Sequence, residues 1–286
     1  FMLFNSYIFV FIFLPLVLAG WYFLNSRGFY QTATCFLAAM SLWFYGYFNP
    51  YYLGIILVSI LGNYLLSFLL RFSRTKLSDR IFLLAGLAFN LGFLFYFKYY
   101  DFFFENINTV FHTNVAMHNI LLPLGISFFT FQQVSFIVDR CQHKAEHYPF
   151  IDYVTFVTFF PQLVAGPIVL YKEMMPQFAD KHLRSFNREN FAKGIALFTL
   201  GLSKKVLLAN VLYELISAYK SAANVSVLFV WLYAAAYVLH LYFDFSGYSD
   251  MAIGLGRIFG FHFIENFNYP YISASVTEFW RRWHMS

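Results

Sequence analysis

Long apolar runs constrain this chain more than any other feature of its sequence. No charged residue occurs between Gly28 and Leu70, and Asn49-Pro50 is the plausible turn within that stretch. A helix needs about 20 mainly apolar residues to cross the hydrocarbon core of a bilayer. We therefore predict two membrane-spanning helices here, joined by a tight loop.

The composition extends this interpretation to the whole chain. Of the 286 residues, 60% are hydrophobic and 12% are charged, whereas soluble domains carry about 25% charged residues. The net charge of +5 comes from dispersed basic residues, which is typical of cytoplasmic loops and argues against a nucleic-acid partner. We predict an all-α fold, a polytopic bundle of transmembrane helices.

Nine apolar runs are candidate spans, and the later ones are interrupted. Pro161 and Pro167 break one run, and Lys204-Lys205 break another. Non-helical backbone at membrane depth survives only when it is buried in protein or lines a cavity. We therefore expect re-entrant or broken helices around a central tunnel. The candidate spans are Tyr7–Leu24, Phe29–Phe48, Tyr51–Leu70, Ile81–Phe97, Ile120–Val138, Tyr153–Tyr171, Gly194–Tyr213, Val225–Phe243 and Met251–Ile264.

We interpret residues 1–286 as a single membrane domain, with scaffold helices over 1–100 and a tunnel-forming part over 120–286. No charge precedes Arg27, so the first run is expected to be a retained span and not a cleaved signal peptide. The positive-inside rule assigns the loop after the third span to the cytoplasm and the N-terminus to the other side. That loop contains Arg71, Arg74, Lys76 and Arg80.

Ionisable residues in an apolar run are functional candidates, because a charge at the centre of a membrane helix costs about 2.5–3.5 kcal/mol. The stretch "LHLYFDFSGYSDMAIG" (Leu239–Gly254) is the densest case. His240 and Asp244 are four residues apart and share one helix face. Asp250 is expected in a Gly-Tyr-Ser-Asp turn. Two interpretations stay open here: a structural polar network between helices, or the lining of a polar cavity.

Other polar or small residues in apolar runs have simpler explanations. Gln132 and its neighbour Gln133 are expected to form interhelical hydrogen bonds. Gly256 and Gly260 have the small-xxx-small spacing of a helix-packing face. Lys204-Lys205 are expected to extend towards a membrane interface, as long basic side chains near helix ends do.

The motif "HKAEH" (His143–His147) matches the pattern of inverted zinc peptidases. Pro149 follows directly, so we interpret it as a short cytoplasmic loop and predict no metal site. The chain also lacks the G-x-S-x-G pattern of a nucleophile elbow, the P-loop and a C-x-x-C pair.

The stretch "FWRRWHMS" (Phe279–Ser286) concentrates aromatic and basic residues. A helix that starts near Ser275 would bring Glu278 within one turn of Arg281 and Arg282. Taken alone, tryptophan and arginine at this density favour an interfacial helix. A histidine beside two arginines also suits proton transfer near a thioester or a phosphate.

Five blocks in this order resemble the membrane-bound O-acyltransferase family. They are "LPLGISFFTFQQVSFIVD" (Leu122–Asp139), "FFPQLVAGPI" (Phe159–Ile168), "GLSKKVLLAN" (Gly201–Asn210), "FDFSGYSDMAIG" (Phe243–Gly254) and "NFNYPYISASVTEFWRRWHMS" (Asn266–Ser286). The start "MLFNSYIFVFIFLPL" (Met2–Leu16) is similar too. The resemblance covers the whole chain and is strongest to the bacterial branch that acetylates alginate, cellulose or peptidoglycan or D-alanylates teichoic acid.

The resemblance implies an activity. Family members surround a buried tunnel with helices and move an acyl group from an intracellular donor to a hydroxyl on the extracytoplasmic side. In this branch the donor is an acyl thioester on an acyl carrier protein or coenzyme A, used as a co-substrate, with no bound cofactor. The implied partners are a polysaccharide or cell-wall acceptor, soluble acylation proteins and the lipid membrane. The implied location is the inner cell membrane.

The resemblance also implies site residues. His284 matches a tunnel histidine, with Arg281, Arg282, Trp283 and Glu278 beside it. The family's principal histidine comes several dozen residues later, so we expect the sequence to be the N-terminal part of a longer protein that is inactive without the rest. The other residues that we expect to line the tunnel are Gln132, Asp244, Ser246, Tyr248 and Asp250.

Three functions remain open at this point. The first is O-acylation of an exported polysaccharide such as alginate, with D-alanyl transfer to teichoic acid as its close variant. The second is a transporter or channel, which the interrupted spans and the acidic residues within them would also suit. The third is a scaffold that recruits acylation partners without catalysis.

Overall fold

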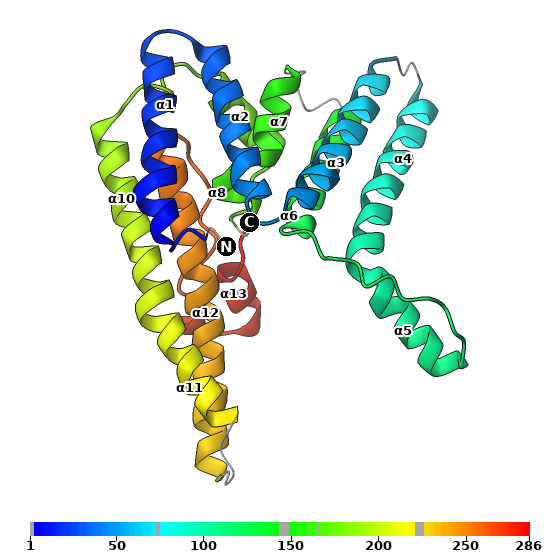
Figure 1. Cartoon of the computed structure of the whole chain (residues 1–286), viewed down its shortest axis with the longest axis vertical. Coiled ribbons are helices and arrows are strands. Elements are labelled where there is room, and N and C mark those ends of the chain that lie inside the picture. Colours follow the sequence, from blue (N-terminus) through cyan, green and yellow to red (C-terminus); the bar gives the residue numbers. More distant parts are fainter. Residues whose placement is uncertain (1–2, 73–74, 143–148, 165, 221–225) are drawn as a thin grey trace. The chain divides into compact units, whose positions relative to one another are not determined.

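The fold is described by a computed structural model that covers residues 3–72, 75–142, 149–164, 166–220 and 226–286 (Figure 1). Within these residues the regular structure is helical, and the one isolated bridge joins Phe267 and Trp283. The predicted all-α fold is therefore confirmed. The zinc-peptidase-like motif at 143–147 lies outside the described residues.

The chain divides into two compact units. Unit 1 comprises Phe1–Ala33, Ala165–Val169 and Asp180–Ser286, and unit 2 comprises Thr34–Val164 and Leu170–Ala179. The predicted division into scaffold helices and a tunnel-forming part follows other boundaries and stays a prediction.

Unit 1 is built from helices at both ends of the sequence, coloured blue and yellow-green to red in Figure 1. Its main element is α12, a helix of 32 residues that packs along α10. The elements are the π-helical turn η1 (Phe9–Phe13), α1 (Leu14–Ser26), α10 (Arg188–Ser203), the π-helical turn η4 (Lys204–Ala209), α11 (Asn210–Lys220), α12 (Val227–Ile258), the short η5 (Pro270–Ile272) and α13 (Val276–Arg282).

Unit 2 contains the helices between them, in blue to green in Figure 1. The division between the units falls within α2, whose first turn belongs to unit 1. The elements are α2 (Tyr30–Gly46), α3 (Pro50–Leu69), η2 (Leu70–Phe72), α4 (Lys76–Leu94), the π-helical turn η3 (Phe95–Tyr99), α5 (Tyr100–Phe111), α6 (Ile126–Cys141), α7 (Phe150–Thr158), α8 (Phe160–Leu163) and α9 (Tyr171–Ala179).

In the described part of the chain, five helical segments are long and apolar enough to cross a bilayer. The chain is thus a multi-pass membrane protein. The tight loop predicted between the second and third spans is confirmed, because Asn49 accepts a hydrogen bond from Tyr51 N–H and caps α3. The five segments are Phe9–Ser26, Pro50–Leu69, Lys76–Phe111, Arg188–Tyr219 and Val227–Ile258.

Two predicted boundaries in unit 2 were wrong. The fourth span does not end at Phe97, because the helix continues through η3 and α5 to Phe111. The next span begins at Ile126 and not at Ile120, since Gly125 takes the left-handed conformation (φ 69°) that starts α6. A side chain there would lie 2.5 Å from the carbonyl oxygen of Leu163, so glycine is required at this position.

The predicted broken helix around Pro161 is confirmed. The helical run stops at Thr158, Phe159 adopts an extended ψ of 107°, and α8 restarts with Pro161 in its first turn. Two buried donors at the break are bonded within the protein: Gln162 Nε2 donates to the Phe156 carbonyl at 2.5 Å, and Phe160 N–H donates to Ser41 Oγ at 3.4 Å. The break is therefore tolerated because protein groups replace the missing helical hydrogen bonds.

The prediction of two spans over Val225–Phe243 and Met251–Ile264 was wrong. One helix, α12, runs from Val227 to Ile258, so the expected Gly-Tyr-Ser-Asp turn at Gly247–Asp250 is helical. The glycine there serves helix packing instead. A side chain on Gly247 would lie 2.8 Å from the Gly201 carbonyl oxygen of α10.

Four glycines in two pairs bring α10 and α12 together. A Cβ added to Gly194 would lie 2.7 Å from the carbonyl oxygen of Gly254, and a Cβ added to Gly201 would lie 2.5 Å from that of Gly247. Both pairs are separated by seven residues along each helix, two turns of helix. Small residues allow such close backbone contact between membrane helices. The predicted packing pair, Gly256 and Gly260, instead meets Phe263 and the Leu183 carbonyl.

Unit 2 is held together by a cluster of neutral polar side chains, which we call the amide cluster: Ser59, Asn63, Asn90, Gln133 and Tyr153. Asn63 Nδ2 donates to Asn90 Oδ1 at 3.0 Å and to Gln133 Oε1 at 2.9 Å. Gln133 Nε2 donates to Ser59 Oγ at 2.9 Å. The interhelical hydrogen bonds predicted for Gln133 are confirmed, and they join α3, α4, α6 and α7.

Candidate functional site

Most of the predicted site residues lie in unit 1, on α12, on α13 and in the segment after it. Gln132 is the exception, because it belongs to α6 of unit 2, where its side chain is buried. Its Oε1 atom has no hydrogen-bond partner within the described structure. The interhelical hydrogen bond predicted for this residue is therefore not formed at Oε1, in contrast to its neighbour Gln133.

Helix α13 begins as the sequence predicts. Ser275 caps it by accepting a hydrogen bond from Glu278 N–H at 3.1 Å, and Glu278 Oε2 accepts one from Ala274 N–H at 2.9 Å. This reciprocal arrangement resembles a capping box. The pKa of Glu278 is lowered, first by the Ala274 hydrogen bond and then by Arg282.

The charge pair predicted for Glu278 forms with Arg282. Arg282 Nη2 lies 2.7 Å from Glu278 Oε1, four residues earlier on the same helix. Arg282 also donates to the Asn268 carbonyl at 3.5 Å. Arg281 and Trp280 are exposed, so the two arginines of the motif have different surroundings.

A short antiparallel pairing fixes the chain after α13. Asn268 N–H donates to the Arg282 carbonyl at 2.9 Å, and Met285 N–H donates to the Asn266 carbonyl at 3.0 Å. Asn266 is buried, and its Oδ1 accepts from Ser286 Oγ at 2.9 Å. The pairing places the ring of Trp283 against Phe267, with centroids 5.1 Å apart.

His284 lies in this pairing and has a strained backbone with a φ of 53°. Its ring meets Phe245 of α12 edge-on at 5.1 Å. Its Nδ1 atom lies 3.5 Å from Ser286 Oγ. Burial lowers the pKa of His284 below its ordinary value of 6.5, so the imidazole is neutral at pH 7 and can accept a proton.

Two ion pairs cross between η4 and α12. Lys204 Nζ lies 2.5 Å from Asp250 Oδ2, and Lys205 pairs with Asp244 Oδ1. The four side chains are between 24% and 37% exposed. The predicted extension of the lysines towards an interface is replaced by this pairing. Pairing with an opposite charge lowers the free-energy cost of placing each charged side chain within the membrane.

The shared face predicted for His240 and Asp244 is confirmed, because both meet η4. His240 Nδ1 lies 2.9 Å from the Ala209 carbonyl oxygen, and Asp244 pairs with Lys205. η4 is a π-helical turn, a distortion that occurs frequently at functional sites.

Ser246 and Tyr248 point elsewhere. Ser246 is fully buried in α12, and Tyr248 stacks on Phe4 with centroids 4.7 Å apart. Tyr242, which the sequence did not single out, connects α12 to the last segment: its ring lies 6.1 Å from Trp283 and 5.2 Å from Tyr271. Its position two residues before Asp244, within the same motif, was the available signal.

Comparison with known proteins identifies relatives. Residues 102–286 match the family model of the membrane-bound O-acyltransferase family. The chain is 37% identical to a peptidoglycan O-acetyltransferase of Helicobacter pylori and 40% identical to a probable alginate O-acetylase, AlgI, of Pseudomonas aeruginosa. Each alignment covers 100% of this chain, and 59% and 55% of the relative, respectively.

A more distant relative has another acyl group in its name. The chain is 33% identical to a teichoic acid D-alanyltransferase of Bacillus subtilis, over 59% of this chain and 43% of that protein. The chain thus spans little more than half the length of the O-acetylating relatives. The family model nevertheless matches well over half of the chain, in blocks that include the α12 motif and the His284 segment, and the chain belongs to the membrane-bound O-acyltransferase family.

Proposed function

We propose that this chain is part of a membrane O-acyltransferase that transfers an acyl group, most simply acetyl, to hydroxyls of an exported cell-surface polysaccharide such as alginate. The observation that carries the proposal is that the whole of this chain aligns with part of two named O-acetylating proteins, at 37% and 40% identity. The D-alanyltransferase aligns over a shorter part at 33%, which favours acetyl over D-alanyl.

His284 is proposed as a histidine that assists the reaction. A hydroxyl of the acceptor donates its proton to the neutral imidazole while its oxygen attacks the carbonyl carbon of an acyl thioester. The tetrahedral intermediate collapses, the carbon–sulfur bond breaks, and the thiolate leaving group takes up the proton. Help from a general base is worth about 10²–10⁴-fold in rate. The lowered pKa of His284 supports this role.

The charged side chains around η4 would make the site polar, and none of these charges would be unpaired. Lys204–Asp250 and Lys205–Asp244 are neutral as pairs, so they can face a cavity at a smaller cost than a single ion. Arg281 is exposed on α13 and is proposed to meet the donor, since guanidinium groups bind phosphates and carboxylates.

The donor is proposed to be an intracellular acyl thioester, on an acyl carrier protein or on coenzyme A. A tunnel around His284, which we propose as part of this function, would keep water from the thioester. We propose an inner-membrane location with the N-terminus on the extracytoplasmic side, which the basic cluster after the third span supports through the positive-inside rule.

The test uses the full-length protein in membrane vesicles with a labelled acetyl thioester and an alginate acceptor. His284→Ala is expected to lower transfer by about 10²-fold or more and to leave the amount of folded protein unchanged. His262→Ala, which changes an exposed histidine outside this pairing, is the matched control. Equal transfer by wild type and His284→Ala would refute the role of His284.

Two other functions are tested in the same vesicles. The ion pairs within apolar helices would also suit a transporter, and solute flux without any acyl transfer would refute the proposal. Labelled D-alanyl thioester tests the close variant: transfer of D-alanine in preference to acetyl would reassign the acyl group. A scaffold function predicts neither reaction.

A further inference from the structure

A second polar site lies in unit 1, away from His284, where α1 ends. A cavity of about 380 Å³ lies between the last turn of α1, the start of α2 and the loop before α10. Its size falls within the range of about 300–1,000 Å³ that is typical of ligand pockets. We call it the α1 pocket, and its lining residues are Tyr22, Phe23, Asn25, Ser26, Tyr30, Lys181, Arg184, Ser185 and Phe186.

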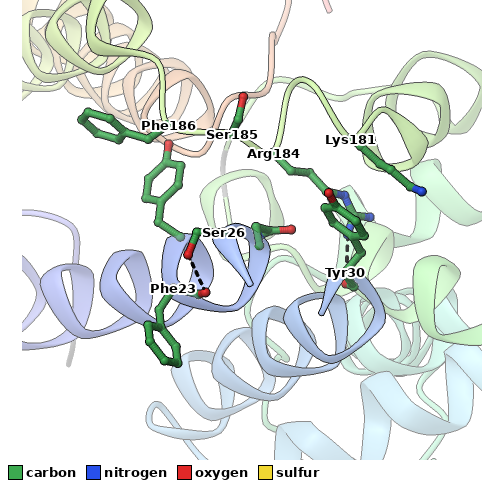
Figure 2. Close-up of a pocket in the computed structure, with 9 residues that line it drawn as sticks. Phe23, Ser26, Tyr30, Lys181, Arg184, Ser185 and Phe186 are labelled. Atoms are coloured by element: carbon green, nitrogen blue, oxygen red, sulfur yellow. Dashed lines mark hydrogen bonds between the residues drawn. The ribbon is translucent and has the colours of Figure 1, made fainter. Parts of the chain in front are cut away.

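Positive charge gathers on one side of the α1 pocket, as Figure 2 shows for Lys181 and Arg184. Arg184 is only 6% exposed; its Nη1 donates to the Tyr30 carbonyl at 3.0 Å, and its guanidinium lies 5.5 Å from the Trp21 ring. Lys181 is exposed and lies over the Tyr30 ring at 5.1 Å. A buried arginine fixed by such contacts and an exposed lysine beside it suit a phosphate.

The α1 pocket also offers a hydrogen-bond acceptor. Asn25 is 6% exposed, and its Nδ2 donates to the Trp21 carbonyl at 2.7 Å. Its Oδ1 is buried and has no partner within the described structure. A buried acceptor without a partner costs about 1–3 kcal/mol, which a ligand donor would recover. The C-terminal end of α1 also carries partial negative charge, which favours a cationic or hydroxyl donor there.

The edge of the α1 pocket is apolar. Phe23 and Phe186 are 60% and 54% exposed, and they lie beside the end of the first membrane span, Phe9–Ser26. Amphipathic ligands place a polar head at this depth and apolar chains along the span. Arg27, the C-cap of α1, and Arg188 at the start of α10 add positive charge to this end of unit 1.

We propose that the α1 pocket binds a phosphate that carries a hydroxyl or ammonium group close to it, the chemistry of a phospholipid headgroup. Lys181 and Arg184 hold the phosphate, Asn25 Oδ1 accepts from the hydroxyl or ammonium, and Phe23 and Phe186 contact the chains. A soluble glycerol phosphate shares the phosphate and the hydroxyl, so the experiment separates the two sources. The proposal is independent of the acyl transfer.

The experiment measures lipid retention by the purified full-length protein in detergent, by native mass spectrometry. Phosphatidylglycerol and phosphatidylethanolamine are expected to be retained more strongly than phosphatidylcholine, whose headgroup has no N–H or O–H, and diacylglycerol, which has no phosphate. Lys181→Gln is expected to lower retention of phosphatidylglycerol by about tenfold, the equivalent of one charge-assisted hydrogen bond. Lys181→Arg keeps the charge and is expected to restore retention.

Arg188→Gln is the matched control, because it removes an exposed cation of the same region that does not line the α1 pocket. It is expected to change retention less than twofold. Asn25→Leu is expected to abolish the preference over phosphatidylcholine and to leave binding of the phosphate itself intact. Thermal unfolding of each variant identifies any loss of folding, and retention is compared only among folded variants.

The outcomes distinguish a phospholipid from a soluble glycerol phosphate as the ligand. Retention of phosphatidylglycerol that an excess of glycerol phosphate leaves unchanged identifies a phospholipid site. Saturable binding of glycerol phosphate that Lys181→Gln weakens identifies a soluble phosphate ligand in the same pocket. Equal retention of diacylglycerol and phosphatidylglycerol, or equal losses with Lys181→Gln and Arg188→Gln, would refute the proposal.

Discussion

Both units hold polar side chains among apolar helices, but they use different chemistry to do so. In unit 2 the amide cluster is neutral, buried and satisfied by hydrogen bonds among α3, α4, α6 and α7. In unit 1 the polar groups between η4 and α12 are ion pairs that stay up to 37% exposed. The comparison indicates that unit 2 uses polarity for structure, whereas unit 1 keeps charge accessible.

The two units also pack their helices differently. Between α10 and α12 of unit 1, glycines bring backbone against backbone. In unit 2, side chains fill the equivalent space: a Cβ at Gly62 would meet the ring of Phe89, and one at Gly86 would meet Ile137. A side chain can change its rotamer to make room for a larger residue, whereas a backbone atom cannot. The contact of α10 with α12 is therefore expected to tolerate larger residues less well than the contacts of α4 with α3 and α6.

The largest expected effect comes from Gly201→Leu. The added Cβ would lie 2.5 Å from the Gly247 carbonyl oxygen and 2.6 Å from Met251 N. Extra methylenes in a tight contact force backbone shifts that cost about 1–3 kcal/mol or more. We expect loss of folded protein in fluorescence-detected size-exclusion chromatography. Gly92→Leu, with open space around its Cβ, is the control. Normal folding of Gly201→Leu would show that α10 and α12 can separate.

Gln133→Leu is expected to destabilise unit 2 by about 2 kcal/mol. It removes three hydrogen bonds, with Asn63, Ser59 and Tyr153, and interhelical bonds in membranes are worth about 0.6 kcal/mol each on average. Gln132→Leu is the matched control, because it changes the adjacent residue, whose Oε1 is not bonded. Thermal unfolding measures both. If the two variants unfold together, the amide cluster does not stabilise the unit.

The ion pairs of unit 1 are expected to contribute less to stability than the amide cluster. A double-mutant cycle with Lys204→Met and Asp250→Asn is expected to give a coupling energy of about 0.2–1 kcal/mol, as for other partly exposed pairs. If these groups serve the reaction, the single variants lose acyl transfer while they keep most of their stability. A coupling energy as large as the loss from Gln133→Leu would mean that both units use polarity for structure.

The last expected effect is confined to a narrow pH range: stability depends on pH through His284. Burial lowers the pKa of His284 in the folded protein below 6.5, so the unfolded chain binds the proton more readily below that pH. Stability is then lost as the pH falls from about 7.5 to 5.5, with a slope of at most about 1.4 kcal/mol per pH unit for one group. Thermal unfolding of wild type and His284→Gln over this range measures the difference. Parallel curves would show that His284 is solvated.

Part of this structure could be predicted from sequence because it depends on local composition. The apolar runs predicted the spans in α1 and α3, Asn49-Pro50 predicted the loop before α3, and Ser275 with Glu278 predicted the start of α13. The continuous helix α12 was missed because Gly247, followed by Tyr, Ser and Asp, resembles the sequence of a turn. In a helix the same residue allows close packing, and only the partner helix distinguishes the two roles.

The sequence by itself determined that this chain is a helical membrane protein, since apolar runs of this length are stable only as helices in a bilayer. It also determined the family, through ordered blocks that surround His284 and the α12 motif. The tertiary structure decided which charges pair, which amides are satisfied and where the α1 pocket lies. The contacts between elements join residues 20 to 154 positions apart, and their geometry depends on helix register and close packing that no local pattern encodes.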